Sequence, residues 1–240
     1  MYNLTQFSLK EMTECGAALR KMGDGADRFE EASARIVTYL YQNLLDGAGQ
    51  PACALVRLFK THPYRGISPE LQEFASSKVG KREIDPSQKC FVLAASAGQR
   101  SEWNNPALSV RFKAIPLGGD EFIAQFPMFS QLLTQFGVDL HSFLQPGSNL
   151  LVDRHETTFN VFYVQEAAGS LYIPSQEAFV KPYAIRSVLG FGTALPSGEI
   201  FAVILFSKIS IPREIADLFQ TLALCSKVAL LPFDGDGAFM

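Results

Sequence analysis

Cysteine and histidine are the side chains in this chain best suited to catalysis or metal binding. The 240 residues include four cysteines and three histidines: Cys15, Cys53, Cys90, Cys225, His62, His141 and His155. No two cysteines have the Cys-x-x-Cys spacing of a zinc ribbon or a thioredoxin-like motif. All four lie within apolar segments, where a free thiol behaves as a small apolar side chain and its thiolate is disfavoured. We therefore expect buried thiols in a reducing compartment.

No other group of residues forms a complete catalytic or metal-binding motif. Asp153 and His155 would share one face of a strand as two metal ligands, but no third ligand is visible, so we predict no metal site. The chain has no Gly-x-Ser-x-Gly motif for nucleophilic catalysis. Two glycine-containing fragments are weak candidates for a phosphate-binding loop. Gly190-Phe191-Gly192 is more typical of a strand, and Gly118-Gly119-Asp120 is more typical of the start of a helix. The sequence therefore assigns no catalytic residue and identifies no cofactor.

The first part of the chain predicts helices followed by two strands. Ser8-Leu9-Lys10-Glu11 is a capping-box pattern, and apolar residues recur at helical spacing after Asp24, so we expect N-terminal helices over residues 8–46. Residues 51–61 and 89–97 have the length and composition of strands. Both faces of the first strand are largely apolar, which predicts a central strand covered on both sides.

The last quarter of the chain predicts two strands and a helix. Two apolar runs, 185–192 and 200–207, flank Pro196-Ser197-Gly198, which is a hairpin signal. Apolar residues at helical spacing then predict a helix over residues 212–231. Five large apolar side chains on one face of that helix would together contribute several kcal/mol of burial, so the helix should dock on the sheet.

Order and spacing of these elements resemble a GAF domain, a ligand-sensing module of signalling proteins. The resemblance is carried by the helix from Asp24, the strand pair, the hairpin through Gly198 and the closing helix. It implies an α+β fold (an α/β sandwich) with a central antiparallel sheet, terminal helices on one face and an aromatic-rich insertion on the other. Residues 1–240 would form a single sensor domain. The phrases 59–64, 159–164 and 185–192 also resemble the N-terminal segment of bacterial sensor histidine kinases, whose kinase core is absent here.

The resemblance implies a pocket between the sheet and the variable segment, residues 98–180. Ligand sites are mainly apolar with a few placed polar groups, and the residues in and beside this segment fit that description. We predict eight ligand-binding residues: Trp103, Arg111, Phe126, Phe129, Tyr163, Gln176, Tyr183 and Arg186. Any one of these aromatic residues is also a candidate for ordinary core packing.

Composition excludes several classes of protein. The net charge of -3 and the absence of a basic run argue against nucleic-acid binding. No stretch approaches the roughly 20 apolar residues that span a bilayer, and the N-terminus lacks the pattern of a secretory signal. We therefore expect a cytoplasmic protein that does not insert into a membrane.

The expected function is sensing without catalysis. A small-molecule ligand, or a change in packing, would bias the terminal helices, which would pair in a parallel homodimer and act on a downstream kinase or another output domain. Two alternatives stay open. Some GAF-fold proteins reduce methionine sulfoxide with cysteines, and Cys53 and Cys90 lie on neighbouring predicted strands. The chain would otherwise be a protein-interaction module with a filled pocket.

Overall fold

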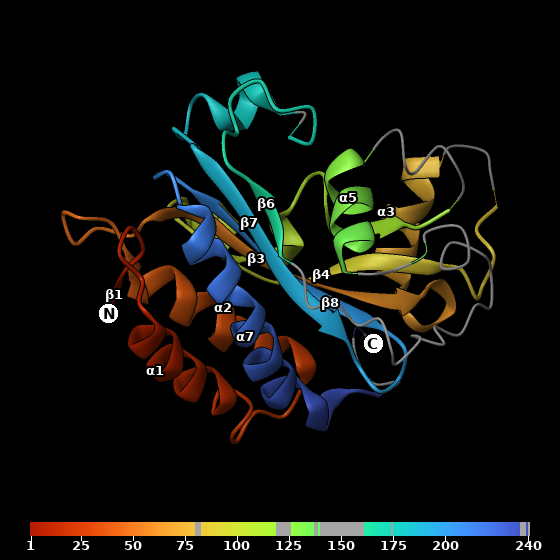
Figure 1. The fold of residues 1–240 in the computed structure, drawn as a ribbon. Coiled ribbons are helices and arrows are strands. Elements are labelled where there is room, and N and C mark those ends of the chain that lie inside the picture. The colour runs from red at the N-terminus through yellow and green to blue at the C-terminus, as the bar shows by residue number, and fades with distance from the viewer. Residues whose placement is uncertain are drawn as a thin grey trace.

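The fold is an antiparallel sheet covered on both faces (Figure 1). The computed structural model describes residues 1–79, 83–118, 126–136, 139, 161–173, 175–235 and 239. Six strands form the sheet in the order β5-β4-β3-β8-β7-β6, and every neighbouring pair is antiparallel. Their bounds are β3 (Cys53–Pro63), β4 (Lys89–Gly98), β5 (Ala114–Pro116), β6 (Phe162–Val164), β7 (Ser187–Ala194) and β8 (Ile200–Ser207). The first long strand, β3, therefore lies at the centre.

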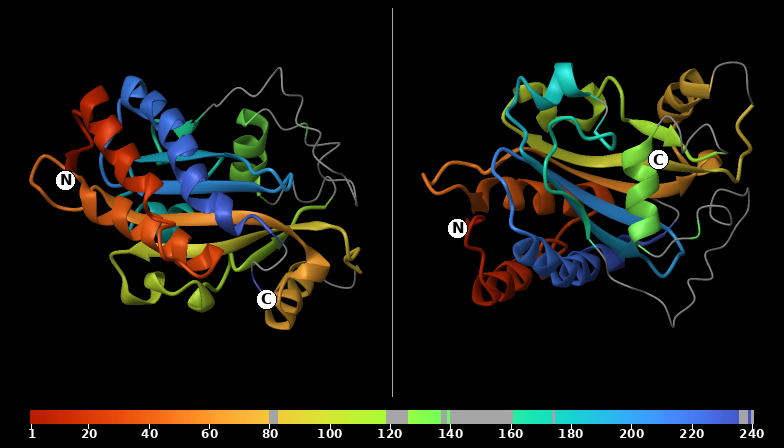
Figure 2. Two further views of the ribbon diagram at one scale, coloured as in Figure 1. Left: turned by 90° about the horizontal axis from the view of Figure 1, so that it is seen from below. Right: turned by 45° about the horizontal axis from the view of Figure 1, so that its top comes forward.

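Three helices cover one face of the sheet: α1 (Leu9–Arg20), α2 (Phe29–Asn43) and α7 (Arg213–Leu230). Figure 2 shows them together on one side, with α5 (Pro127–Gln135) on the other. The remaining elements are β1 (Tyr2–Asn3), β2 (Leu44–Leu45), α3 (Pro69–Val79), and the short helical turns η1 (Tyr64–Gly66), η2 (Ser101–Asn104), η3 (Pro106–Leu108), η4 (Gln176–Val180) and η5 (Leu231–Phe233). The α+β class and the predicted placement of helices and insertion on opposite faces are confirmed.

Strand alternation divides the buried residues between two cores. Along β8, Phe201, Val203 and Leu205 pack into the core under the terminal helices. Ala202, Ile204 and Phe206 pack into the second core, under α5 and η4. Both faces of the strand are buried because successive side chains of a strand point to opposite sides. The sheet thus separates the core under the helices from the core under the described part of the covering segment.

Glycines on β7 allow α5 to approach the sheet closely. A Cβ atom on Gly190 would lie 3.0 Å from Leu132 Cδ1, and one on Gly192 would lie 3.0 Å from Phe136 Cε2 and 2.1 Å from the Phe201 carbonyl oxygen. The fragment Gly190-Phe191-Gly192 is therefore a packing feature of a strand.

Some predicted ends of helices and strands are confirmed and others are wrong by several residues. The capping box at α1 is present, with the Ser8 backbone N–H donating to Glu11 at 2.8 Å and the Glu11 N–H donating to Ser8 Oγ at 3.3 Å. The predicted start of the second helix at Asp24 is wrong, since α2 begins at Phe29 after Arg28. Strand β3 runs on to Pro63, beyond the predicted end at residue 61, because β4 continues to pair with it as far as Lys89.

Helix α7 also meets the length and composition criteria for a membrane-spanning helix. With the turn that follows, it spans Arg213–Phe233, and by length and composition this stretch is apolar enough to cross a membrane. Half of its apolar window is buried inside the protein, where α7 packs on α1 and β7. A core helix of a soluble domain passes the same test, and the packing explains the composition.

Candidate functional site

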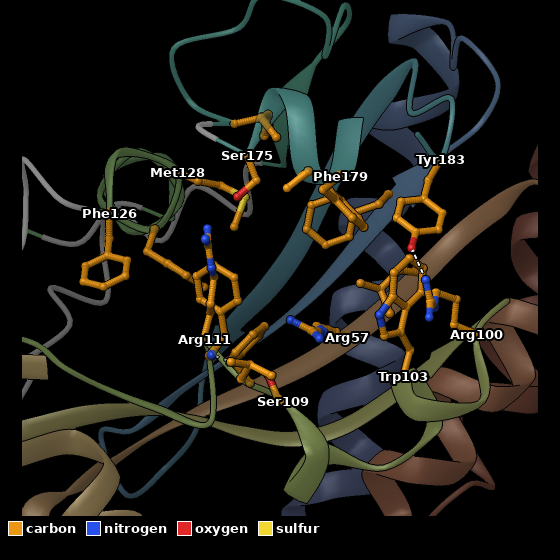
Figure 3. Close-up of a pocket in the computed structure, with 18 of the residues that line it drawn as sticks. Arg57, Arg100, Trp103, Ser109, Arg111, Phe126, Met128, Ser175, Phe179 and Tyr183 are labelled. Carbon is orange, nitrogen blue, oxygen red and sulfur yellow. Dashed lines mark hydrogen bonds between the residues drawn. The ribbon is translucent and has the colours of Figure 1, made fainter. Parts of the chain in front are cut away.

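A cavity of about 820 Å³ lies between the sheet and the segment that covers its second face (Figure 3). Its floor is formed by Leu55, Arg57 and Phe59 of β3, with Phe206 of β8 beside them. Its walls come from four stretches around η2, η3, the start of α5 and η4. The lining residues there are Arg100, Glu102, Trp103, 108–112, 126–129, Ile173, Ser175, Ala178, Phe179 and Tyr183. The size and the mostly apolar lining are those of a small-molecule site.

Five of the eight predicted ligand residues line this cavity: Trp103, Arg111, Phe126, Phe129 and Tyr183. They come from four separate segments of the chain, which the fold brings around one space. Phe129 is buried and packs edge-on against Phe59 at 5.2 Å between ring centroids. Arg111 is exposed at the mouth, and its guanidinium points into the open space (Figure 3).

The other three predicted ligand residues lie outside the lining. Tyr163 of β6 donates its hydroxyl proton to the carbonyl of Ile211, just before α7, and its ring lies under the Arg213 guanidinium at 5.6 Å. Gln176 holds the preceding loop closed through bonds to Gly169 N, at 2.9 Å, and Ile173 O, at 2.7 Å. The side chain of Arg186 is exposed. Sequence spacing could not separate these structural roles from ligand contact.

One wall of the cavity is an aromatic cluster. Trp103 meets Tyr183 at 4.5 Å and Phe179 at 5.6 Å between ring centroids, both edge-to-face. The Tyr183 hydroxyl accepts a hydrogen bond of 2.7 Å from Arg100, which also pairs with Glu102. Each edge-to-face contact stabilises the cluster by about 1 kcal/mol beyond area burial, so this wall is preformed.

Arg57 is the functional candidate that sequence reasoning missed. It lies on β3 between Leu55 and Phe59, on the face that forms the cavity floor, and its guanidinium points into the cavity (Figure 3). Its Nε atom lies 3.4 Å from Ser96 Oγ, and its guanidinium lies 5.9 Å from the Phe112 ring. Burial lowers the pKa of Arg57 to about 10. The available signal was a charged side chain with apolar residues on both sides of it in a predicted strand.

None of the four cysteines is among the described residues that line this cavity, and Cys53 and Cys90 lie far from each other. Burial raises the pKa of Cys53 and of Cys90 to about 12, so neither is a ready nucleophile. Cys90 pairs with His62 at one end of β3, and Cys53 lies at the other end, nine residues away. At about 3.3 Å per residue the separation is roughly 30 Å. The expectation that Cys53 and Cys90 lie near each other is wrong, because the two strands are antiparallel.

Metal-ligand chemistry is likewise absent from the parts of the chain that the structure describes. No group of three or more His, Cys, Asp or Glu side chains within those parts is placed to hold an ion. His62 is buried, and its ring lies edge-on to Phe239 at 5.9 Å. Asp153, His155, His141 and Gly119-Asp120 lie outside the described residues.

Comparison with known proteins gives similarity to solved structures. No family model matches the chain. No curated protein matches it either. Among solved structures, the chain is similar to the GAF domain from Acinetobacter phosphoenolpyruvate-protein phosphotransferase, with 11% sequence identity and a TM-score of 0.42 over 91% of this chain and 92% of that one.

Proposed function

We propose that this protein is a sensory or regulatory module that binds a small molecule in the cavity over β3, without catalysis of its own. The observation that carries the proposal is the cavity itself, about 820 Å³ in volume and walled by aromatic side chains. An open cavity among the described residues favours ligand binding over a module whose pocket is filled. No described residue of the cavity lining is a nucleophile paired with a base, and the separation of Cys53 from Cys90 removes the support for the reductase alternative.

A route from the cavity to the terminal helices runs through the sheet. Phe206 of β8 lines the cavity, and its neighbour Leu205 packs into the core on the helix side. Because one strand carries both side chains, a shift of its backbone on ligand binding moves both cores together. Packed interiors respond to such shifts as units, which is what a sensor needs for transmission.

The connection from β8 to α7 is also tied to the neighbouring strands. Ser187 of β7 donates its hydroxyl proton to Ile209 O at 2.8 Å and accepts from Ile211 N at 3.3 Å. Tyr163 of β6 donates to the carbonyl of Ile211. These bonds fix where α7 begins, so movement of β6 or β7 is passed directly to the start of that helix.

The setting of the module is part of the proposal. Leu224 and Val228 of α7 and Leu231 at the start of η5 are exposed, at 42%, 48% and 39% accessible, and are spaced by four and three residues. Such a stripe on the terminal helix supports a homodimer with a second copy of this chain. A bacterial cytoplasmic signalling protein with a downstream kinase or another output domain fits these features.

Binding of a neutral apolar dye tests the proposed function. N-phenyl-1-naphthylamine fluoresces when it enters an apolar site, and the protein should bind it saturably. Ala178 lies at the rim of the cavity and is exposed, so Ala178→Trp should fill the space and weaken dye binding by about tenfold or more.

The matched control places the same side chain elsewhere. Ala48 is exposed in the β2–β3 loop, and Ala48→Trp should leave dye binding unchanged. Absence of saturable binding to the parent protein, or equal binding to both tryptophan variants, would remove the support for a ligand pocket.

A further inference from the structure

The cavity has a strong excess of positive charge. Four basic side chains line it, whereas Glu102 is the only carboxylate among the described lining residues. The basic residues are Arg57, Lys78, Arg100 and Arg111. Glu102 pairs with Arg100, which also donates to Tyr183, so the carboxylate and its partner are already matched. The potential left inside the cavity is therefore positive and favours an anion.

Arg57 is the strongest source of that potential, because it lies on the floor and has little compensation. The structure gives it no ion pair with any described carboxylate, and its hydrogen bond to Ser96 is long at 3.4 Å. A guanidinium removed from water needs a partner, and a planar oxyanion group matches its paired N–H donors.

Lys60, the neighbouring cation on the same strand, has a carboxylate partner, in contrast to Arg57. Lys60 is buried on the helix side of the sheet, where its Nζ lies 3.8 Å from Asp234 Oδ1 and 4.7 Å from the centre of the Phe29 ring. The fold thus supplies a carboxylate to the buried cation that faces the core. It supplies none, among the described residues, to the cation that faces the cavity.

The walls define the rest of the ligand. Trp103, Phe179 and Tyr183 form one aromatic wall (Figure 3). Phe112 and Phe129 also line the cavity, with 6.3 Å between their ring centroids, and the Arg57 guanidinium lies 5.9 Å from the Phe112 ring. A flat apolar body would contact the rings while an acidic group at one end reached the floor.

We propose that the cavity selects organic anions, meaning a carboxylate or sulfonate attached to a flat apolar body, and that Arg57 binds the anionic group. This inference rests on the proposed function, since it names the ligand class of the same pocket. Arg111 and Lys78, nearer the mouth, would draw the anion in without being its principal partner.

A pair of dyes that differ in one charged group tests the inference separately from the function. 8-Anilinonaphthalene-1-sulfonate has the aromatic body of N-phenyl-1-naphthylamine plus a sulfonate. Arg57→Met should weaken binding of the sulfonate dye by about 10- to 100-fold, the range expected for a charge-assisted hydrogen bond, and leave the neutral dye bound as tightly as before. Arg57→Lys keeps the charge and should retain most of the affinity for the sulfonate dye.

The control removes an equal charge from the opposite face. Arg20 is exposed at the end of α1, and Arg20→Met should change neither affinity. Naphthoate should displace the sulfonate dye, whereas inorganic phosphate, which has no apolar body, should not.

Each outcome has a distinct meaning. If the parent protein binds neither dye, the proposed function fails together with the inference. If the neutral dye binds and Arg57→Met weakens both dyes equally or neither, the pocket stands and anion selection by Arg57 is refuted. Displacement by inorganic phosphate at concentrations similar to naphthoate would also overturn the inference, because the site would then take simple anions.

Discussion

Replacing Arg57 with methionine should make the ligand-free protein more stable. Burial lowers the pKa of Arg57 from the ordinary range of an arginine to about 10. At 1.36 kcal/mol per unit, the buried cation costs at most about 3 kcal/mol. Methionine loses the contact with the Phe112 ring and the long bond to Ser96, together worth about 1 kcal/mol. Arg57 also keeps partial contact with solvent, so the net gain should be about 1–2 kcal/mol.

The pH dependence of this gain follows from the direction of the shift. Because the pKa of Arg57 is lower in the folded protein than in the unfolded chain, the cation costs stability at every pH below about 10. The cost disappears only as the pH rises through about 10 toward the ordinary pKa range of an arginine. The gain from Arg57→Met should therefore be constant between about pH 6 and pH 9.

Thermal unfolding followed by circular dichroism measures the effect. In a domain of this size 1 kcal/mol corresponds to about 2–4 °C in Tm, so Arg57→Met should raise Tm by roughly 2–8 °C. Arg57→Lys retains a strongly hydrated charge and should give no gain. Exposed Arg20→Met should stay within about 0.5 kcal/mol of the parent. A lower Tm for Arg57→Met, or a change no larger than that of Arg20→Met, would refute the assignment of Arg57 as an uncompensated buried charge.

Four other predictions concern the remainder of the fold. Gly192→Ala should lower the free energy of unfolding in urea by about 1–3 kcal/mol, because its Cβ would meet the Phe201 carbonyl at 2.1 Å; a neutral effect would contradict the close strand contact. Tyr163→Phe should cost about 1 kcal/mol in the same assay through loss of the bond to Ile211, and an unchanged midpoint would show that the bond adds nothing. The four cysteines are buried, so a thiol reagent near pH 8 should label none in the folded protein and all after denaturation, and rapid labelling of the native state would be contrary to this burial. Leu224→Glu should shift a homodimer to monomer in light scattering, and a parent protein that is monomeric at high concentration would end the dimer proposal.

The sequence predicts those parts of the fold in which apolar spacing and turn residues agree. The closing hairpin and helix, expected over 185–231, are found as β7, β8 and α7 almost at the predicted residues. The start of α2 was misplaced because Asp24 is a good capping residue, yet the chain makes further turns and begins the helix at Phe29. Local propensity cannot decide between two acceptable starts when tertiary packing makes the choice.

The candidate site was predicted in part, for a related reason. Aromatic composition identified Trp103, Phe129 and Tyr183 as lining, but it selected Tyr163 equally, and strand pairing places Tyr163 on the opposite side of the sheet. Arg57 was missed because apolar content identified its strand as core. A strand face can either be fully packed or form the floor of a cavity. Which of the two occurs depends on how much of that face the covering segment contacts, and the local sequence of the strand does not determine this.

The alternation along β8 constrains how proteins of this kind can diverge. A change at Ile204 or Phe206 alters the cavity side, but it moves the same backbone that holds Val203 and Leu205 against the helices. Changes on this strand must therefore be tolerated by both cores at once, and substitutions on its two faces should compensate one another. Loop residues at the mouth of the cavity, Arg100 and Arg111 among them, carry no such double constraint. New ligand preferences should consequently arise first at the mouth, while the floor is inherited nearly unchanged.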